Sequence, residues 1–211
     1  MNNCSLCQTP LVNSRRSADG KIYFDCACCG LISLKEEFRL SNEQEKRRYL
    51  LHQNSTGSSG YQEFLERTIA PLRSNIKPGM SGIDYGCGPG PTISKILNAE
   101  GMTVTDYDPY FAPRVFSDSE QFDFITCTET IEHFRNPAVE FEKLSRLVRP
   151  SGWVVLMTEI LDGDISFENW WYIRDRTHVS LYQPKTMEWI AHKYKWCMQI
   201  PSKTVRLYRA A

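Results

Sequence analysis

The sequence predicts an α/β protein: a Rossmann-like, mostly parallel sheet with helices on both faces and a C-terminal antiparallel hairpin, preceded by a small zinc ribbon. Three observations support this prediction. Short β-like runs alternate with helical patterns from Gly82 onward, three glycines follow the first of these runs, and five of the eight cysteines lie within residues 1–29. Repeated strand–helix–strand order is typical of a parallel sheet with covering helices.

Three segments are expected along the chain. Residues 1–34 form a zinc-ribbon-like segment, residues 35–72 a helical lid or linker, and residues 73–211 the α/β domain. The middle segment holds two helical patterns separated by the loop NSTGSSG, which has no apolar residue. Ser41 and Asn42 are candidate N-caps, because their side chains, ahead of a Glu-rich first turn, accept hydrogen bonds from free backbone N–H groups.

Within the α/β domain, the pattern predicts the order of strands and helices. The expected strands are the runs SGIDYG, MTVTDYD, FDFITCTE and SGWVVLMTE, and the expected helices are PTISKILNAEG, NPAVEFEKLSRLV and PKTMEWIAHKY. An aromatic loop, FENWWYIRDRTHVSLY, precedes the last helix. The runs KWCMQI and KTVRLY flank Pro201 and predict the closing antiparallel pair, while KIYFDC and GLISL predict short strands in the N-terminal segment.

The bulk composition argues against several classes of protein. The chain carries 25 basic and 25 acidic residues, and residues 1–60 hold eight Lys/Arg against six Asp/Glu, so no basic surface for nucleic acid is expected. The N-terminus MNNCSLCQTP has no apolar run, and stretches such as WVVLM are too short to cross a bilayer. We therefore expect a cytoplasmic protein without a membrane span; its oligomeric state is not predicted.

The N-terminal cysteines have the spacing of a zinc ribbon. Cys4 and Cys7 form one C-x2-C pair, Cys26 and Cys29 form another, and 18 residues lie between the pairs. Four thiolates complete the tetrahedral shell of Zn²⁺ and leave no open position, so the predicted site is structural. Cys28 is an extra thiol; Cys29 is preferred as fourth ligand because it keeps the two-residue gap. The alternative is that these are small buried cysteines.

The glycines after the first strand form the pattern G-x-G-x-G, with Gly86, Gly88 and Gly90 following Asp84. The dinucleotide fingerprint G-x-G-x-x-G would need a glycine at Pro91, so the match to a pyrophosphate site fails. A phosphate-binding P-loop is excluded as well, since no Gly-Lys-Ser/Thr follows. The glycines still permit a ligand to lie against the backbone at the carboxyl end of a strand, and the alternative is an ordinary strand-to-helix turn.

An acidic residue follows the second strand, 18 residues after Gly90. Asp108 ends the run TVTDYD and precedes Pro109, whereas Asp106 lies two residues earlier. A carboxylate in this position can accept hydrogen bonds from ribose hydroxyls. We prefer Asp108 because the chain must leave the strand there.

These motifs, DYGCGPG, Asp108, FDFITCTETIEHF and LVRPSGWVVLMT, resemble the class I S-adenosylmethionine-dependent methyltransferases. The resemblance covers roughly residues 62–211 and implies S-adenosylmethionine as cofactor. It implies that the glycine turn with Asp84 holds the methionine part, Asp108 holds the ribose, and the segment TETIEH, beginning at Thr128, lines the reaction centre. Only 13 residues separate Asp108 from Phe122, too few for the usual helix and full third strand, so the adenine-contacting acid is uncertain, with Asp118 a weak candidate.

Three histidines are candidate catalytic residues. His178 lies in the aromatic loop and is the first choice for general base, since the resemblance implies that this loop closes over the substrate. His133 follows TETIE, and His52 lies beside the serine-glycine loop; each could instead have a structural or solvent-exposed role. His192 is interpreted as a surface residue.

Two further groups of residues have open roles. Trp170, Trp171, Tyr172 and Tyr182 could stack on a flat acceptor or belong to the core. The helix containing Arg47 and Arg48 could be a solvated face or meet an anionic substrate.

The zinc-bearing N-terminus and the pattern ExxRYxxHxN resemble a bacterial subgroup of these methyltransferases, and zinc-bearing N-termini also occur in some nucleotide-sugar C-methyltransferases and some ribosomal RNA methyltransferases. The preferred function is methyl transfer to a small-molecule acceptor. The alternatives are an RNA methyltransferase whose ribbon holds RNA, which the near-neutral charge argues against, and a non-catalytic binding module, which the intact motifs argue against. The acceptor atom (oxygen, nitrogen or carbon) is not predicted.

Overall fold

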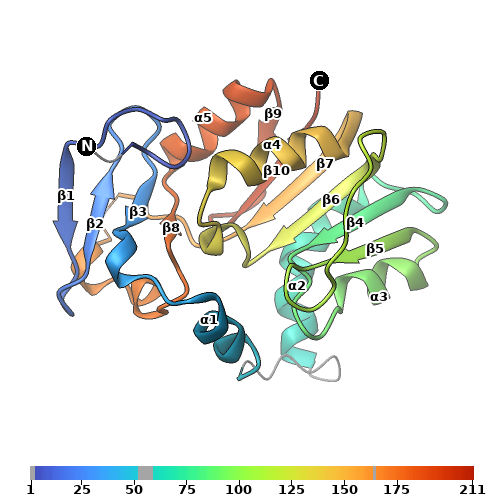
Figure 1. The fold of residues 1–211 in the computed structure, drawn as a ribbon. Helices are drawn as coiled ribbons and strands as arrows, with labels where there is room; N and C mark the ends of the chain where they lie inside the picture. Colours follow the sequence, from blue (N-terminus) through green and yellow to red (C-terminus); the bar gives the residue numbers. More distant parts are fainter. Residues whose placement is uncertain (1–2, 52–58, 164) are drawn as a thin grey trace.

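The computed structural model describes residues 3–51, 59–163 and 165–211. Its centre is a six-stranded sheet with the order β5-β4-β6-β7-β10-β9 (Figure 1). The four strands β4, β5, β6 and β7 run parallel, and β10 and β9 add an antiparallel pair at one edge. The predicted mostly parallel sheet with a C-terminal hairpin is therefore confirmed. The bounds are β4 (Ser81–Tyr85), β5 (Thr103–Tyr107), β6 (Phe122–Thr128), β7 (Val148–Met157), β9 (Cys197–Gln199) and β10 (Val205–Arg209).

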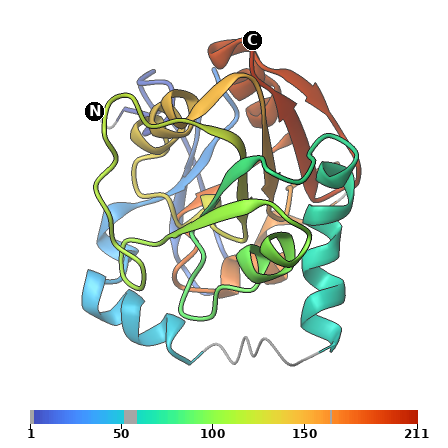
Figure 2. The same cartoon turned by 90° about the vertical axis from the view of Figure 1, so that its right-hand side faces the viewer.

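Helices cover both faces of this sheet, as predicted. α2 (Ser59–Arg73) and α3 (Ile93–Ala99) pack on one face, and α4 (Pro137–Leu147) and α5 (Pro184–Tyr194) lie on the other (Figure 2). Successive residues of a strand point to opposite faces, so Val154 in β7 joins the core under α4 and α5 while Val155 joins the core under α2. Both side chains are fully buried, which stabilises the fold by about 1.5–3 kcal/mol each.

The N-terminal segment supplies three strands of a second, four-stranded antiparallel sheet with the order β1-β2-β3-β8, and the fourth strand comes from the loop before α5. Its strands are β1 (Asn13–Arg16), β2 (Ile22–Asp25), β3 (Ile32–Leu34) and β8 (Ser180–Leu181). The sequence predicted β2 and β3 but neither β1, whose side chains are mostly exposed, nor β8, which has two residues. Pairing of Ile32 with Leu181 brings the loop that carries His178 onto the N-terminal sheet.

A short helix, α1 (Asn42–Tyr49), follows the N-terminal sheet and the 3-10 turn η1 (Glu36–Phe38). Of the two predicted caps, Ser41 is the N-cap: its hydroxyl accepts from the Gln44 N–H, and the Gln44 side chain accepts from the Ser41 N–H. This capping box satisfies two backbone donors that the first turn leaves free. In Figure 1, α1 lies between the two sheets, at the end where the parallel strands terminate.

The segment between Tyr107 and Phe122 contains no helix or strand, and the structure describes all of it. The prediction that the usual third strand is missing is thus confirmed, and β5 forms one edge of the large sheet. Three 3-10 turns complete the elements: η2 (Ile131–His133), η3 (Phe167–Asn169) and η4 (Trp171–Arg174). Within the described residues, no helix is long and apolar enough to cross a membrane.

Candidate active site

A cavity of about 600 Å³ opens at the carboxyl ends of β4, β5 and β6, bordered by α1 and α2. Parallel α/β sheets place their ligands at this edge, because the strand-to-helix loops converge there. The structure brings together seven of the residues predicted from sequence in the lining of this one cavity: Asp84, Gly86, Gly88, Asp108, Thr128, His133 and His178.

The glycine turn has the backbone conformation that glycine permits. Gly86 and Gly88 have φ values of +88° and +63°, and the Gly86 N–H donates to the Tyr107 carbonyl at 2.7 Å. A Cβ at Gly86 would lie 2.8 Å from the Cβ of Thr130 and closer still to its Oγ1 and Cγ2. Gly90, the third predicted glycine, lies at the end of the turn, where its carbonyl accepts from the Thr92 hydroxyl.

Asp84 and Asp108 lie on either side of this turn. Asp84 is buried and accepts from the Thr126 hydroxyl at 2.8 Å. Burial raises the pKa of Asp84 to about 7, and the neighbouring Asp106 and Asp108 add to the shift. The Asp108 carboxylate accepts from the backbone N–H groups of Gly88, Tyr110 and Phe111 at 3.1, 2.8 and 3.1 Å. Asp108 therefore fixes the position of the glycine turn relative to the loop after β5.

Two histidines, His133 and His178, also line the cavity. His178 is buried, and its Nδ1 lies 2.8 Å from the Tyr172 carbonyl; the Nδ1 of His133 lies 3.1 Å from the Thr177 carbonyl. The two imidazole centroids are 4.9 Å apart. Burial lowers the pKa of His178 to about 4, so its imidazole is neutral near pH 7.

The other two histidines, His52 and His192, are not among the residues that line the cavity in the described part of the chain. His192 is exposed on α5, as predicted. His52, the third catalytic candidate, falls outside the residues that the structure describes.

Sequence reasoning missed two glutamates that lie beside these histidines. Glu129 and Glu132 line the cavity, and Glu132 is fully buried, where it accepts from the Tyr172 hydroxyl and from the Thr158 hydroxyl at 3.0 Å. Burial and the nearby Glu132 carboxylate raise the pKa of Glu129. The sequence did contain a pattern that could have identified them. TETIEH places two carboxylates within four residues of the end of a predicted strand.

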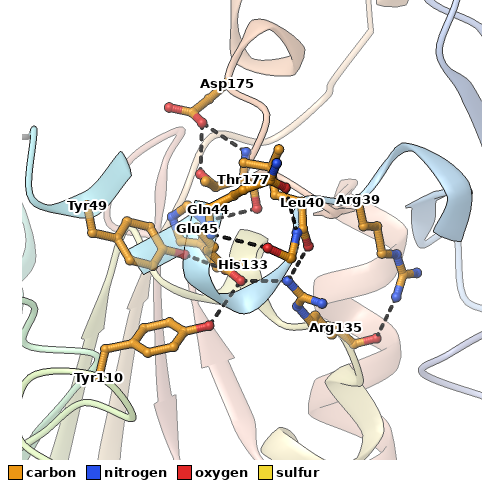
Figure 3. A network of polar contacts seen from close by, with 11 residues as sticks. Arg39, Leu40, Gln44, Glu45, Tyr49, Tyr110, His133, Arg135, Asp175 and Thr177 are labelled. Atoms are coloured by element: carbon orange, nitrogen blue, oxygen red, sulfur yellow. Dashed lines mark hydrogen bonds and ion pairs between the residues drawn. The ribbon is translucent and has the colours of Figure 1, made fainter. Parts of the chain in front are cut away.

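Helix α1 closes one side of the cavity through a buried carboxylate (Figure 3). Glu45 accepts from the hydroxyls of Tyr49 and Tyr110 at 2.7 and 3.2 Å and from the Arg135 guanidinium at 2.8 Å. Arg135 also donates to the Leu40 carbonyl at 2.7 Å. Glu45 therefore connects α1 to the loop after β5 and to the loop after β6.

A second connection joins α1 to the loop that carries His178. Arg48 donates two hydrogen bonds to Asp175, at 2.9 and 3.0 Å, and Asp175 in turn accepts from the N–H and hydroxyl of Thr177. Arg48 thus has an internal acidic partner, which argues against the hypothesis that it meets an anionic substrate. Arg47 is exposed on the same helix.

The aromatic residues of the loop before α5 have mainly a packing role. Trp170, Tyr172 and Tyr182 are buried, and Trp171 is 58% exposed. Among the described residues, other aromatics line the cavity: Tyr49, Tyr61, Phe64, Tyr85, Tyr107, Tyr110, Phe111 and Phe134. Asp118, the weak candidate for contacting adenine, is fully exposed and pairs with Arg146 instead.

The four predicted zinc ligands converge in the N-terminal segment. The Sγ atoms of Cys4 and Cys29 are 3.6 Å apart, those of Cys7 and Cys26 are 3.3 Å apart, and all four lie within 4.8 Å of one another. A tetrahedral Zn²⁺ with Zn–S bonds of about 2.3 Å would hold its sulfurs about 3.8 Å apart. These residues therefore fit a zinc ion, whereas Cys28 is exposed.

Comparison with known proteins connects this geometry to a family. The curated relatives include the ubiquinone biosynthesis O-methyltransferase of Pseudomonas aeruginosa, 34% identical over 96 residues that cover 45% of this chain and 39% of the relative. The mitochondrial enzyme of the same name from Arabidopsis thaliana is 32% identical over 136 residues, covering 51% and 42%. The chain thus spans about half or less of the length of these relatives.

Solved structures share the fold at low sequence identity. A phosphoethanolamine N-methyltransferase 2 from Haemonchus contortus superposes with a TM-score of 0.56 at 15% identity, covering 80% of this chain and 47% of that one. An O-methyltransferase family protein from Burkholderia thailandensis gives a TM-score of 0.53 at 13% identity, covering 79% and 62%. Residues 58–196 match the family model described as a methyltransferase domain, and this match extends over more than half of the chain. The chain therefore belongs to the methyltransferase domain family.

Proposed function

We propose that this protein is an S-adenosylmethionine-dependent methyltransferase that acts on a small-molecule acceptor. The observation that carries the proposal is that two groups of residues line one cavity. The first group is the glycine turn with Asp84 and Asp108, and the second group is the cluster of Glu129, Glu132, His133 and His178. The H. contortus structure, by its title, contains S-adenosylhomocysteine, which supports the same type of ligand here.

The first group of residues suits the cofactor. Gly88 leaves its backbone uncovered for close approach, because a Cβ there would meet no atom within 4 Å, and Asp84 and Asp108 supply carboxylates beside the turn. Asp108 would hold the ribose hydroxyls, while Asp84, Gly86, Gly88, Gly90 and Thr128 would surround the methionine part. When bound, S-adenosylmethionine supplies the methyl group from its sulfonium centre. A sulfonium is cationic, so the acidic lining of the cavity favours it electrostatically.

The second group of residues suits the acceptor. Methyl transfer from a sulfonium is an in-line displacement, so the protein mainly has to align the acceptor and take up its proton. His178 or His133 would receive that proton at Nε2, because Nδ1 of each ring already faces a backbone carbonyl. The curated relatives are named for O-methylation, which makes hydroxyl compounds the first acceptors to test.

We also propose that Cys4, Cys7, Cys26 and Cys29 hold a structural zinc ion. The ribbon then supports the segment that follows His178, since the Gly30 carbonyl accepts from the Gln183 side chain at 2.6 Å, next to β8. Ser5 likewise accepts from the Ala138 N–H, at the start of α4.

A methyl-transfer assay tests the proposed function. Protein incubated with methyl-labelled S-adenosylmethionine and a panel of small phenols, diols, amines and carboxylic acids should transfer label to one class, and total RNA should receive none. His178→Ala should abolish most transfer while keeping S-adenosylhomocysteine binding, and His192→Ala should behave as wild type. Label appearing in RNA, or in no acceptor although cofactor binds, would contradict a small-molecule methyltransferase.

A further inference from the structure

Two carboxyl groups, those of Glu129 and Glu132, line the cavity together with His133 and His178. Glu132 is fully buried, and it lies close enough to Glu129 to contribute, after burial, to the raised pKa of Glu129. Within residues 3–51, 59–163 and 165–211, neither carboxylate forms an ion pair with Lys or Arg, and the partners of Glu132 are the hydroxyls of Thr158 and Tyr172. A buried carboxylate is costly unless it is protonated, paired or bound to a metal.

The two histidines beside Glu132 have their tautomers fixed by the backbone. A carbonyl oxygen only accepts hydrogen bonds, so Nδ1 of His178 must carry the hydrogen that faces Tyr172, and Nδ1 of His133 the hydrogen that faces Thr177. In a neutral ring with this tautomer, the Nε2 atom presents a lone pair. This pattern, in which the second ring nitrogen donates to a backbone carbonyl, is the usual support of metal-binding histidines.

The three side chains form a compact donor set on one wall of the cavity. One ligand atom from each of Glu132, His133 and His178 lies within 4.8 Å of the others, and all three residues line the cavity. They come from two separate segments, η2 and the loop before β8, which the Val179 N–H joins by donating to the Glu132 carbonyl at 2.9 Å. Two imidazoles and one carboxylate are a common ligand set for divalent transition metals, with open positions for water or substrate.

We propose that Glu132, His133 and His178 bind a divalent transition-metal cation, distinct from the zinc of the cysteine ribbon. The cation would give the buried Glu132 carboxylate a positively charged partner. Its open positions would face the cavity, where they could bind and polarise an oxygen of the acceptor. Polarising the acceptor rests on the proposed methyltransferase function. When the cation is bound, this polarisation replaces the proton-accepting role of His133 and His178. The binding of the cation itself does not depend on methyl transfer.

Metal stoichiometry tests the proposal on the whole protein. Protein that keeps its ribbon zinc is titrated with Co²⁺ by calorimetry, without cofactor, and metals are then counted after gel filtration. We expect one zinc and one added cobalt per chain. Glu132→Gln and His178→Ala should weaken cobalt binding by about 10–100-fold or more, the range that loss of even a supporting hydrogen bond produces at metal sites.

Matched controls separate this result from misfolding and from non-specific binding. His192→Ala and Glu188→Gln change the same residue types on the exposed face of α5 and should bind cobalt as wild type does. Thermal unfolding and S-adenosylhomocysteine affinity, measured on every variant, report separately on folding and on the cofactor site. Wild-type protein that binds no cobalt, or Glu132→Gln and His178→Ala variants that bind it with unchanged affinity, would overturn the proposal even if methyl transfer is found.

Discussion

Substitution of Gly86 by alanine tests whether position 86 requires glycine because of its positive φ and its close contact with Thr130. The φ of +88° is strained for a residue with a Cβ, at about 1–2 kcal/mol. The new Cβ would also overlap the Thr130 side chain, and overpacking of this kind typically costs about 1–3 kcal/mol. We therefore expect Gly86→Ala to lower the free energy of unfolding by about 2–5 kcal/mol.

Gly20→Ala is the matched control for this experiment. Gly20 has a similar φ of +85°, but a Cβ there meets no atom within 4 Å. The Gly20→Ala variant should therefore lose only the free energy that the positive φ costs, without a steric overlap. Urea unfolding followed by tryptophan fluorescence should show Gly86→Ala about 1–3 kcal/mol less stable than Gly20→Ala. Adding Thr130→Gly should recover part of this difference, because all three overlapping atoms belong to Thr130. Equal stabilities of the two glycine variants would refute the steric argument.

Three further predictions concern the zinc ribbon, the Asp175 ion pair with α1 and the role of His178. A Cys4→Ser/Cys7→Ser protein should lose about one zinc per chain by metal analysis, since two of four ligands are gone; full zinc content would contradict the ribbon. Burial raises the pKa of Asp175, but the hydrogen bonds from Arg48 and Thr177 outweigh it and lower the pKa below its usual value. Asp175 therefore stabilises the fold above its unfolded pKa of about 3.9, and the unfolding free-energy difference between wild type and Asp175→Asn should shrink as the pH falls below that value; a constant difference would rule out the ion pair. His178→Ala should lower the rate of methyl transfer by about 10²–10⁴-fold in single-turnover assays, and an unchanged rate would remove His178 from the mechanism.

The parts of the site that follow strand ends could be predicted from the sequence. Asp84, Gly86 and Asp108 belong to local patterns, because each follows from where a strand stops and the chain turns. The alternation of short apolar runs with helical patterns likewise predicted which elements form the sheet, since a parallel sheet has helices over both faces and its strands are mostly apolar. The short connection after Asp108 correctly predicted the loss of the third strand.

The other half of the site depends on contacts between distant segments, which local patterns do not encode. Glu45 looks like a solvent-exposed helix residue, yet it is buried against Tyr110 and Arg135, which lie 65 and 90 positions further along the chain. The two-residue strand β8 is too short to show a period, although its pairing with β3 positions the His178 loop. Glu132 was missed for the same reason, because its burial depends on Tyr172 and Thr158.

The central claim is that the glycine turn and Asp108 hold S-adenosylmethionine, and a calorimetric titration tests it most directly. Wild-type protein should bind S-adenosylhomocysteine with micromolar affinity, and Asp108→Ala should lose most of that affinity while its thermal unfolding shows that it still folds. If folded, zinc-loaded wild-type protein does not bind this ligand, or if Asp108→Ala binds it equally well, the cofactor site has been assigned to the wrong part of the molecule.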